Sequence, residues 1–276
     1  MRSVRLCVLS SGSGGNSLWA EAGSVRVLVD AGLPLRETAR RCAEAGVDLK
    51  SVTDVFLTHE HADHCHGAGV LARKLGVRIH ATAGTFHWLR DPPPDELRCT
   101  LEAGAPVELG ALSVLPVALP HDASEPVAYV LSAGGVRAAV VSDLGSAPSG
   151  VVRALQGLDA LVLEFNHDLP MLLNGPYPWS LKRRIRSDLG HLSNEQSAAL
   201  LSQVLHGGLR WLALSHLSEH NNTEAKARRA AEKVLTKFGS SSKMLVASQA
   251  HALEPVELLP SAVTPLRRPR QLALFG

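Results

Sequence analysis

The sequence predicts an α/β fold in which two facing mixed sheets carry helices on their outer sides. Strand-like apolar runs alternate with helix-like segments toward both ends of the 276-residue chain. Between them, residues 100–142 hold apolar runs separated by Gly and Pro, which is typical of successive antiparallel strands. With 45% hydrophobic residues the chain can bury an ordinary core, and we expect residues 1–255 to form a single domain.

Bulk composition excludes several classes of protein. The net charge of +2 creates no overall field that would require a nucleic-acid partner. The four cysteines are far apart, which argues against a zinc knuckle or a disulfide framework and fits a reducing compartment. Arginines interrupt the N-terminal apolar run, and no run approaches the ~18 apolar residues of a membrane span. We therefore expect a cytoplasmic protein with no membrane partner.

The first half of the chain predicts alternating strands and helices. Strands are expected at residues 4–9, 18–22, 25–29 and 78–80, with another ending just before His59, and helices at 34–45, 67–75 and 85–89. Gly46 and Gly76 end the two longer helices. The Gly-rich stretch 10–17 is either a plain turn or a loop that holds an anion through backbone N–H groups.

The second half begins with antiparallel strands and returns to alternation. Strands are expected at residues 112–119, 127–131, 136–141, 160–164 and 209–214, with a last strand at 244–247. Helices are expected near 150–156, from the cap Ser193 to about Val204, and from the cap Asn222 to Phe238. Ser193 and Gln196 have the spacing of a capping box, so the start of that helix is the most clearly marked.

A cluster of metal-competent side chains follows the strand that ends before His59. His59, His61, Asp63 and His64 fall within six residues. In a loop leaving a strand, His59 and His61 can reach one ion while Asp63 and His64 turn to a second, which suits Zn²⁺ or Mn²⁺. The alternative interpretation is a polar loop of solvated histidines. That interpretation would suffice for a single histidine, but it does not account for three within six residues.

Three further polar residues follow predicted strand ends, and strand ends meet at one edge of a sheet. The predicted ligands are His59, His61 and His121 for one ion, Asp63, His64 and His216 for the second, and Asp143 as the bridge between them. Water held between two such ions is acidified toward neutral pH and becomes a nucleophile. Taken singly, His121 or His216 is as well explained as a buried structural histidine.

Three other residues are candidates for orienting the ligands from behind. Asp30 ends the predicted strand 25–29, where it either forms a turn or fixes a metal-bound histidine. His167 and Asp168 follow the strand 160–164 and are assigned the same supporting role.

The order Asp30, His59-x-His61-x-Asp63-His64, His121, Asp143, His216 resembles the metallo-β-lactamase superfamily over about residues 4–250. This resemblance implies a four-layer αβ/βα sandwich with two metal ions at one edge between the sheets. It does not choose among lactams, thioesters, lactones and phosphodiesters as substrates, because one fold serves many reactions.

Glu164 and His191 resemble the glutamate and histidine pair that ribonuclease Z and related nucleases add to this site. A histidine backed by a carboxylate can stabilise charge on a phosphoryl oxygen or protonate a leaving oxygen, which the poor leaving group of a phosphodiester needs. The alternative interpretation is that His191 is an ordinary helix-capping or surface residue.

A basic segment with aromatic residues lies between these two groups. Its candidate nucleic-acid contacts are Tyr177, Trp179, Lys182, Arg183, Arg184 and Arg186. Cations can bind phosphates while an aromatic ring stacks on an unpaired base. A solvated helix face is the alternative, but the position between two suspected catalytic groups favours nucleic acid.

Residues 10–17, 164–168, 191–194 and 217–222, with the basic segment, resemble the YycJ (WalJ) family of bacterial proteins. This resemblance implies a 5′→3′ exonuclease that acts on double-stranded DNA in DNA repair, specifically mismatch repair. One departure is Cys65-His66, where an apolar residue is expected beside His64; His66 is not assigned as a ligand.

The last residues, 256–276, are predicted to form a flexible basic tail. Within it, Gln271, Leu272, Leu274 and Phe275 resemble the short peptide with which bacterial replication and repair proteins bind the DNA sliding clamp. The alternative is a tail that folds back on its own domain.

The combined hypothesis is a dinuclear metal-dependent phosphodiesterase acting on DNA. Asp63 would accept the proton of the attacking water, and His191 with Glu164 would support the departing or non-bridging oxygen. Three alternatives stay open: an RNA-processing nuclease of the ribonuclease Z type, a hydrolase of thioesters or lactones, and a clamp-bound interaction module whose site is vestigial.

Overall fold

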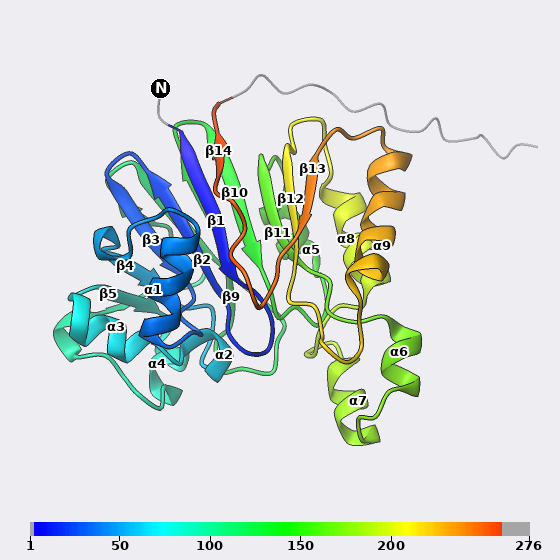
Figure 1. Ribbon diagram of the computed structural model, residues 1–276, viewed down its shortest axis with the longest axis horizontal. Helices are drawn as coiled ribbons and strands as arrows, with labels where there is room; N and C mark the ends of the chain where they lie inside the picture. Colours follow the sequence, from blue (N-terminus) through cyan, green and yellow to red (C-terminus); the bar gives the residue numbers. More distant parts are fainter. Residues whose placement is uncertain (1–2, 261–276) are drawn as a thin grey trace, which may run out of the picture.

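The computed structural model describes residues 3–260, which form two seven-stranded mixed sheets packed face to face (Figure 1). The predicted clamp-binding residues, Gln271, Leu272, Leu274 and Phe275, lie outside the described residues. Helices cover the outer side of each sheet, so the predicted αβ/βα sandwich is confirmed. In residues 3–260, every helix is too short or too polar to cross a membrane.

The first sheet contains the N-terminal strands. Its order is β14 (Val256–Leu258), β1 (Val4–Ser10), β2 (Ser17–Ala22), β3 (Val25–Val29), β4 (Asp54–Phe56), β5 (Arg78–Ala81) and β6 (Arg98–Thr100). Neighbours from β14 to β3 pair antiparallel, and neighbours from β3 to β6 pair parallel. The parallel half therefore directs the carboxyl ends of β3 and β4 to the same edge.

The second sheet repeats this division between parallel and antiparallel halves. Its order is β13 (Lys243–Val246), β12 (Trp211–Ser215), β11 (Ala160–Glu164), β10 (Val136–Val141), β9 (Val127–Ala133), β8 (Leu112–Ala118) and β7 (Val107–Leu109). Strands β10 to β13 pair parallel, and β7 to β10 pair antiparallel. The carboxyl ends of β10, β11 and β12 consequently lie side by side.

The helices divide between the two halves of the chain. Those of the first half are α1 (Leu35–Glu44), α2 (Ala62–Cys65), α3 (Ala68–Leu75) and α4 (Ala83–Trp88), with short 3₁₀ turns at Leu49–Ser51 and Asp95–Leu97. Those of the second half are α5 (Ser149–Ala154), α6 (Leu169–Asn174), α7 (Trp179–Ile185), α8 (Asn194–Val204) and α9 (Glu224–Lys237). Figure 1 shows α8 and α9 outside the second sheet, and α6 and α7 projecting beyond its lower edge.

Alternation of side chains along the strands separates three apolar layers. In β11, Val162 packs between the two sheets, whereas Leu161 and Leu163 pack against the outer helices. In β1, Val8 points between the sheets, and Leu9 points to the layer under α1 and α3. This period of two is what a strand buried on both faces requires, and it holds the strand ends at fixed positions.

Several predicted boundaries differ from the structure. The strand predicted at residues 244–247 is present as β13, but it is not the last strand. A further strand, β14, pairs antiparallel with β1 and adds an edge to the first sheet. This strand falls in the segment that we assigned to the tail, so the domain extends at least to residue 258. The predicted cap of α9 is also wrong: Thr223, not Asn222, accepts a hydrogen bond from the Lys226 backbone N–H.

Candidate metal centre

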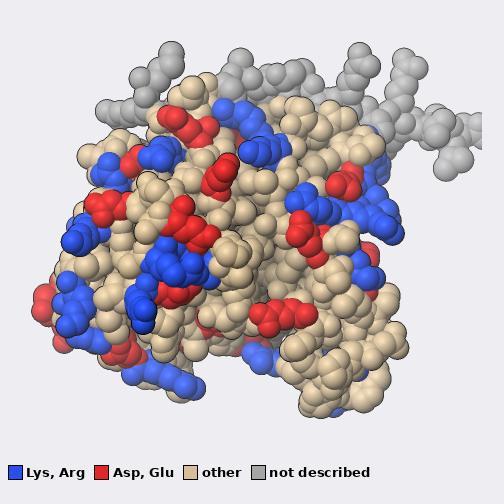
Figure 2. Space-filling model, in the orientation of Figure 1, with Lys and Arg blue, Asp and Glu red and all other residues tan. Residues whose placement is uncertain are grey.

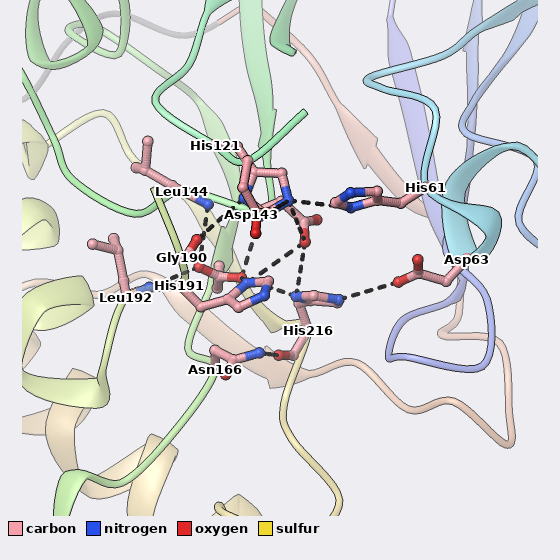
Figure 3. Close-up of polar contacts among 12 residues, drawn as sticks. His61, Asp63, His121, Asp143, Leu144, Asn166, Gly190, His191, Leu192 and His216 are labelled. Carbon is pink, nitrogen blue, oxygen red and sulfur yellow. Dashed lines mark hydrogen bonds and ion pairs between the residues drawn. The ribbon is translucent and has the colours of Figure 1, made fainter. Parts of the chain in front are cut away.

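The candidate site lies at one edge of the sandwich, where strand ends of both sheets meet. His59 and His61 follow β4, Asp143 follows β10, and His216 follows β12 directly. Figure 3 shows His61 and Asp63 on one side, facing Asp143 and His216 on the other. The two sheets thus bring together residues that are up to 157 positions apart in the chain (216 − 59).

Three site residues have an unusual backbone conformation. Of the described residues other than glycine, Asp30, Asp143 and His216 have positive φ, at 63°, 56° and 54°. Each follows the end of a strand, so the left-handed turn changes the direction of the side chain just where the strand stops. Such conformations are strained for residues with a Cβ, and they cluster at functional sites.

Two groups of three potential ligands lie on either side of Asp143. The ligand atoms of His59, His61 and His121 are within 4.8 Å of one another. The same limit holds for the group of Asp63, His64 and His216. Both trios are the ones that the sequence predicts for the two ions.

Asp143 lies between the two groups. Its Oδ2 is 3.0 Å from His64 Nε2, and its Oδ1 is 3.8 Å from His121 Nε2. This is the position that the predicted bridging carboxylate requires.

Four histidines of the centre share one pattern of hydrogen bonding: Nδ1 contacts the protein, and Nε2 faces the interior of the site. The Nδ1 partners are Thr58 for His59, Asp30 for His64, the Gly190 carbonyl for His121, and Glu164 for His216. Metal-bound histidines usually have such a partner on the other ring nitrogen, which fixes the ring and its tautomer.

Unpartnered buried atoms show that these residues fit a cation. Among the described residues, His59 Nε2 and His216 Nε2 are buried without a hydrogen bond, and Asp143 Oδ2 has only the 3.0 Å ion pair with His64 Nε2. A buried polar atom without a partner is costly, and an ion between these nitrogen and oxygen atoms would satisfy them. The mixed donor set suits Zn²⁺ or Mn²⁺.

Electrostatics also favour positive charge here. Burial alone would lower the pKa of His64 and His216, but the carboxylate of Asp143 and its acidic neighbours outweigh burial and raise both pKa values well above the ordinary one. Burial, reinforced by His64, lowers the pKa of His59. The pKa of Asp143 is held well below its usual value by His216 and His64, despite burial. A divalent ion can take the place of the bound protons.

Residues 59–64 form the first wall of the site, and Asp30 supports this wall from behind. Its Oδ2 accepts a hydrogen bond from His64 Nδ1 at 2.7 Å, and its Oδ1 accepts from the Thr58 hydroxyl and backbone N–H at 2.9 and 2.8 Å. Of the two roles that the sequence left open, these contacts favour orientation of a ligand. Thr58, whose hydroxyl also lies 3.0 Å from His59 Nδ1, is a supporting residue that sequence reasoning missed.

Asn16 is a second residue that sequence reasoning missed. Its Nδ2 lies 3.3 Å from Asp63 Oδ2 and 3.0 Å from His64 Nε2. The Gly-rich stretch 10–17 holds it there, because the Asn16 backbone N–H donates to the Asp63 carbonyl at 2.7 Å. The stretch was noticed as glycine-rich, but only the fold reveals that it wraps around Asp63.

The second wall of the site consists of His121, Asp143, His191 and His216. The buried carboxylate of Glu164 is hydrogen bonded to several of these residues. Its Oε2 accepts hydrogen bonds from the Nδ1 atoms of His191 and His216, both at 2.9 Å, and its Oε1 accepts from the Leu192 backbone N–H at 2.9 Å. The Asp143 backbone N–H donates to the same carboxylate. Burial raises the pKa of Glu164, but the two histidines outweigh it and lower the pKa to about 2.

Complete burial changes the role of Glu164. The residue has no exposed surface and does not line the pocket. Its prediction as a catalytic residue is therefore corrected: it is a positioning residue that fixes His191 and His216 together.

His191 is the histidine of this wall that faces the pocket. Its side chain is 19% exposed, and its Nδ1 lies 3.6 Å from Asp143 Oδ1. The helix α8 is capped by Ser193 and Gln196, which form the predicted capping box, so His191 is not the cap. Burial would lower the pKa of His191, but Glu164 outweighs it and raises the pKa above its ordinary value.

His167 and Asp168 have structural roles, and their prediction as supports of the metal ligands is wrong. The Asp168 carboxylate caps α6 by accepting from the Met171 backbone N–H at 3.0 Å, and it pairs with Lys226 Nζ at 3.0 Å. His167 is buried, its Nδ1 is 3.3 Å from Asn166 Oδ1, and burial lowers its pKa to about 4. Within residues 3–260, neither side chain forms a hydrogen bond or ion pair with a predicted ligand.

The basic segment forms α7, which carries only part of the predicted nucleic-acid surface. Lys182 is buried, and its Nζ donates to the carbonyls of Leu173 and Gly175 at 2.8 and 2.7 Å. Its prediction as a phosphate contact is therefore wrong, because the ammonium group ties α7 to the end of α6.

The other residues of this segment differ in position. Arg183, Arg186 and Trp179 are exposed, and Arg184 pairs with Asp122. On the face drawn in Figure 2, Lys and Arg are interspersed with Asp and Glu.

A pocket of about 420 Å³ opens between the metal centre and α7. His61, Asp63, Asp143, His191 and His216 line its floor. Its opposite side is formed by Tyr177, Leu181, Arg184 and Ile185. Ser13, Asn166 and Ser218 are also among the residues that line the pocket. Two of the predicted nucleic-acid residues, Tyr177 and Arg184, thus border the same space as the predicted ligands.

Comparisons with known proteins agree with this geometry. Residues 25–209 match the family described as the beta-lactamase superfamily domain. The chain is 36% identical over 240 residues to exodeoxyribonuclease YycJ of Bacillus anthracis, covering 86% of this chain and 90% of the relative. It is 33% identical over 225 residues to exodeoxyribonuclease WalJ of Streptococcus pneumoniae, covering 80% and 84%.

The fold is also similar to that of a solved nuclease structure. The short form of human tRNase Z superposes with a TM-score of 0.62 at 14% identity, covering 91% of this chain and 98% of the other. At this identity the likeness concerns the fold alone, and the sequence relatives identify the group. The chain belongs to the beta-lactamase superfamily and, within it, to the family of the exodeoxyribonucleases YycJ and WalJ.

Proposed function

We propose that this protein is a two-metal phosphodiesterase that removes nucleotides from DNA in the 5′→3′ direction and acts in DNA repair, specifically mismatch repair. The names of the relatives support a deoxyribonuclease. The observation that carries the proposal is the pair of ligand trios around Asp143, with His191 beside them in the same pocket. A lactam or thioester hydrolase has less need of such a proton donor.

Seven residues would hold the two ions: His59, His61 and His121 the first, Asp63, His64 and His216 the second, and Asp143 both. When bound, divalent ions supply an acidified water and neutralise charge on a phosphate. Asp63 borders the pocket, and His64 and His216 outweigh burial and hold its pKa well below the usual value. We assign to Asp63 the orientation of the attacking water and the acceptance of its proton.

His191 is assigned the role of proton donor to the departing oxygen. Its Nδ1 is bonded to Glu164, which leaves Nε2 for a substrate in the pocket. The Glu164 carboxylate favours the imidazolium form, so a proton is available for transfer. The leaving alkoxide of a phosphodiester needs this proton more than a good leaving group does.

The α7 wall is assigned to hold the rest of the nucleic acid. Tyr177 can stack on a base, and Arg184 can exchange its contact with Asp122 for one with a phosphate. Arg183 and Arg186 are exposed beside them and can add to phosphate attraction. We do not include Lys182 in this surface.

A nuclease assay with end-labelled substrates tests the proposal. The metal-free protein would be loaded with Mn²⁺ or Zn²⁺ and given 5′-phosphorylated duplex DNA, single-stranded DNA and RNA of the same sequence. We expect metal-dependent release of nucleotides from the 5′ end of the DNA. Faster digestion of RNA, or release from the 3′ end, would contradict the proposal.

We also propose that residues 271–275 bind the DNA sliding clamp. This rests on the sequence Gln-Leu-Ala-Leu-Phe alone. A pull-down with purified clamp compares the full chain with a chain that lacks residues 271–275. Equal retention of the two chains would disprove it, and the exonuclease assay would be unaffected by that result.

A further inference from the structure

A second cavity adjoins the candidate metal centre on the side opposite α7. Its volume is about 360 Å³, and its lining includes Cys65, His66, Trp88 and Arg90. His61 and Ala62 line both this cavity and the main pocket, so the two spaces meet at the metal centre. In Figure 1, α4 and α7 lie on opposite sides of α2. A chain bound at the centre can therefore extend in two directions.

Trp88 gives the second cavity an aromatic surface. The side chain is 62% exposed, although Leu89, which follows it, is buried. Trp88 ends α4, and this helix is fixed at its start by the Thr82 hydroxyl, which accepts from the Thr85 backbone N–H and lies 3.0 Å from the Glu125 carbonyl. An indole ring held by an anchored helix at the rim of a cavity is a stacking surface with little conformational freedom to lose.

The charged groups around Trp88 include one cation, Arg90, that has no ion-pair partner among the described residues. Asp91 in the lining pairs with Arg73 at 2.7 Å, and Glu60 accepts from the Ser124 backbone N–H at 2.8 Å. Arg90 is exposed and has no ion pair within residues 3–260. Glu60 keeps its charge, so the lining is not positive as a whole, and Arg90 is the group in it that can bind a phosphate.

We propose that this cavity binds one unpaired nucleotide of the substrate strand, with its base on Trp88 and its phosphate near Arg90. This inference rests on the proposed function. When a phosphodiester of DNA lies at the metal centre, the strand continues on both sides of the bond that is cut. The cavity would receive the nucleotide on the side away from α7. Its volume is within the range of small-ligand pockets and too small for a base pair with both backbones.

The proposal has a consequence for duplex substrates. Because a single nucleotide fits and a base pair does not, the end of the duplex must open by one pair before the scissile bond reaches the metals. Stacking on Trp88 would offset part of the cost of unpairing, since a base gains free energy by stacking on an aromatic side chain. A mismatched or frayed end would therefore be degraded faster than a fully paired one.

Tryptophan fluorescence tests the binding site without any hydrolysis. Of the four tryptophans, Trp19 and Trp211 are 1% exposed, whereas Trp88 and Trp179 are each 62% exposed. Quenching by an oligothymidylate therefore reports one of the latter two. In Trp179→Phe the remaining exposed tryptophan is Trp88, so we expect the quench to persist in that variant and to be lost when Trp88→Phe is added to it. A quench of the same size in the double variant, or no quench in Trp179→Phe, overturns the proposal.

Hydrolysis kinetics give a second test. For duplex DNA we expect Trp88→Ala to raise KM about tenfold, with Trp88→Phe within about threefold of the wild type, because Phe can still stack. Arg90→Glu should raise KM about fivefold, while Arg36→Glu, a matched charge reversal at an exposed residue of α1 outside both pockets, should not. Unchanged KM in Trp88→Ala and Arg90→Glu overturns the proposal.

A small substrate separates this inference from the proposed function. Bis(p-nitrophenyl) phosphate is a phosphodiester that reports on the metal centre without a DNA strand, and Arg36→Glu, the control outside both pockets, should hydrolyse it at the wild-type rate. A wild-type protein that hydrolyses this compound but degrades no DNA would refute the proposed exonuclease. The fluorescence result would then still decide whether the cavity binds a nucleotide.

Discussion

On the side of the first sheet, four candidate ligands come from six consecutive residues, whereas on the side of the second sheet each comes from a separate segment. The first wall, residues 59–64, is shaped by the end of β4 and the single turn of α2. The second wall consists of His121, Asp143, His191 and His216, and its histidines converge partly because the Glu164 carboxylate bonds two of them. Local chain geometry fixes the first wall, and one buried residue fixes much of the second.

This difference predicts unequal effects when the supporting residues are changed. Glu164→Gln should lower kcat/KM on DNA about 10³-fold, because it removes the charge that holds both His191 and His216. The measurements are steady-state kinetics and the number of metal ions bound per chain. A loss of less than tenfold, with full metal content, would mean that the second wall does not depend on Glu164.

His191→Ala tests the proton donor separately from Glu164. We expect kcat on DNA to fall about 10²- to 10³-fold, with a much smaller loss on bis(p-nitrophenyl) phosphate, whose leaving group needs no proton. The protonated form of His191 exists below its raised pKa, so wild-type activity on DNA should decline as pH rises through that pKa. The variant should lack this decline, and equal losses on both substrates would remove the proton-donor role.

Asp30→Asn is the matched change on the first wall. Asp30 holds one histidine, His64, and the short helix α2 would still position it, so we expect activity to fall only about 10- to 100-fold. The comparison with Glu164→Gln under the same metal concentration is the measurement. A loss as large as that of Glu164→Gln would show that the two walls depend equally on their buried carboxylates.

Asp54→Asn should affect stability and leave the chemistry intact. Burial raises the pKa of Asp54, but hydrogen bonds from His80, Arg78 and Thr53 outweigh it and lower the pKa to about 2 from 3.8. The charged form therefore stabilises the fold by about 2 kcal/mol above pH 4, and this contribution is lost as pH falls from about 4 to 2. Urea unfolding of the wild type and the variant, measured from pH 7 downward, should converge over that window.

The first wall could be predicted from sequence because its geometry is local. Three histidines and an aspartate after a strand have one simple interpretation, and His121, Asp143 and His216 could be added because each follows a recognisable strand end. The central role of Glu164 could not be predicted, since it depends on five hydrogen bonds between segments far apart in the chain.

Three errors have similar physical causes. Lys182 lies in a basic run, and only the fold shows that its ammonium group is bonded to carbonyls at the end of α6. Strand β14 has three residues and no hairpin turn, so its pairing with β1 has no local sequence signal. Asp168 was misassigned because a helix cap and a metal support are the same residue type at the same kind of position.

The left-handed backbone at Asp30, Asp143 and His216 has a consequence for efforts to stabilise the protein by substitution. Glycine tolerates these angles without a Cβ clash, so a glycine at any of the three would relieve strain of about 1–3 kcal/mol. Each such substitution would also remove a ligand or the group that holds one. A screen that selects only for heat resistance would not protect the candidate ligands at these positions, so recovering stable, active variants requires selecting for turnover at the same time.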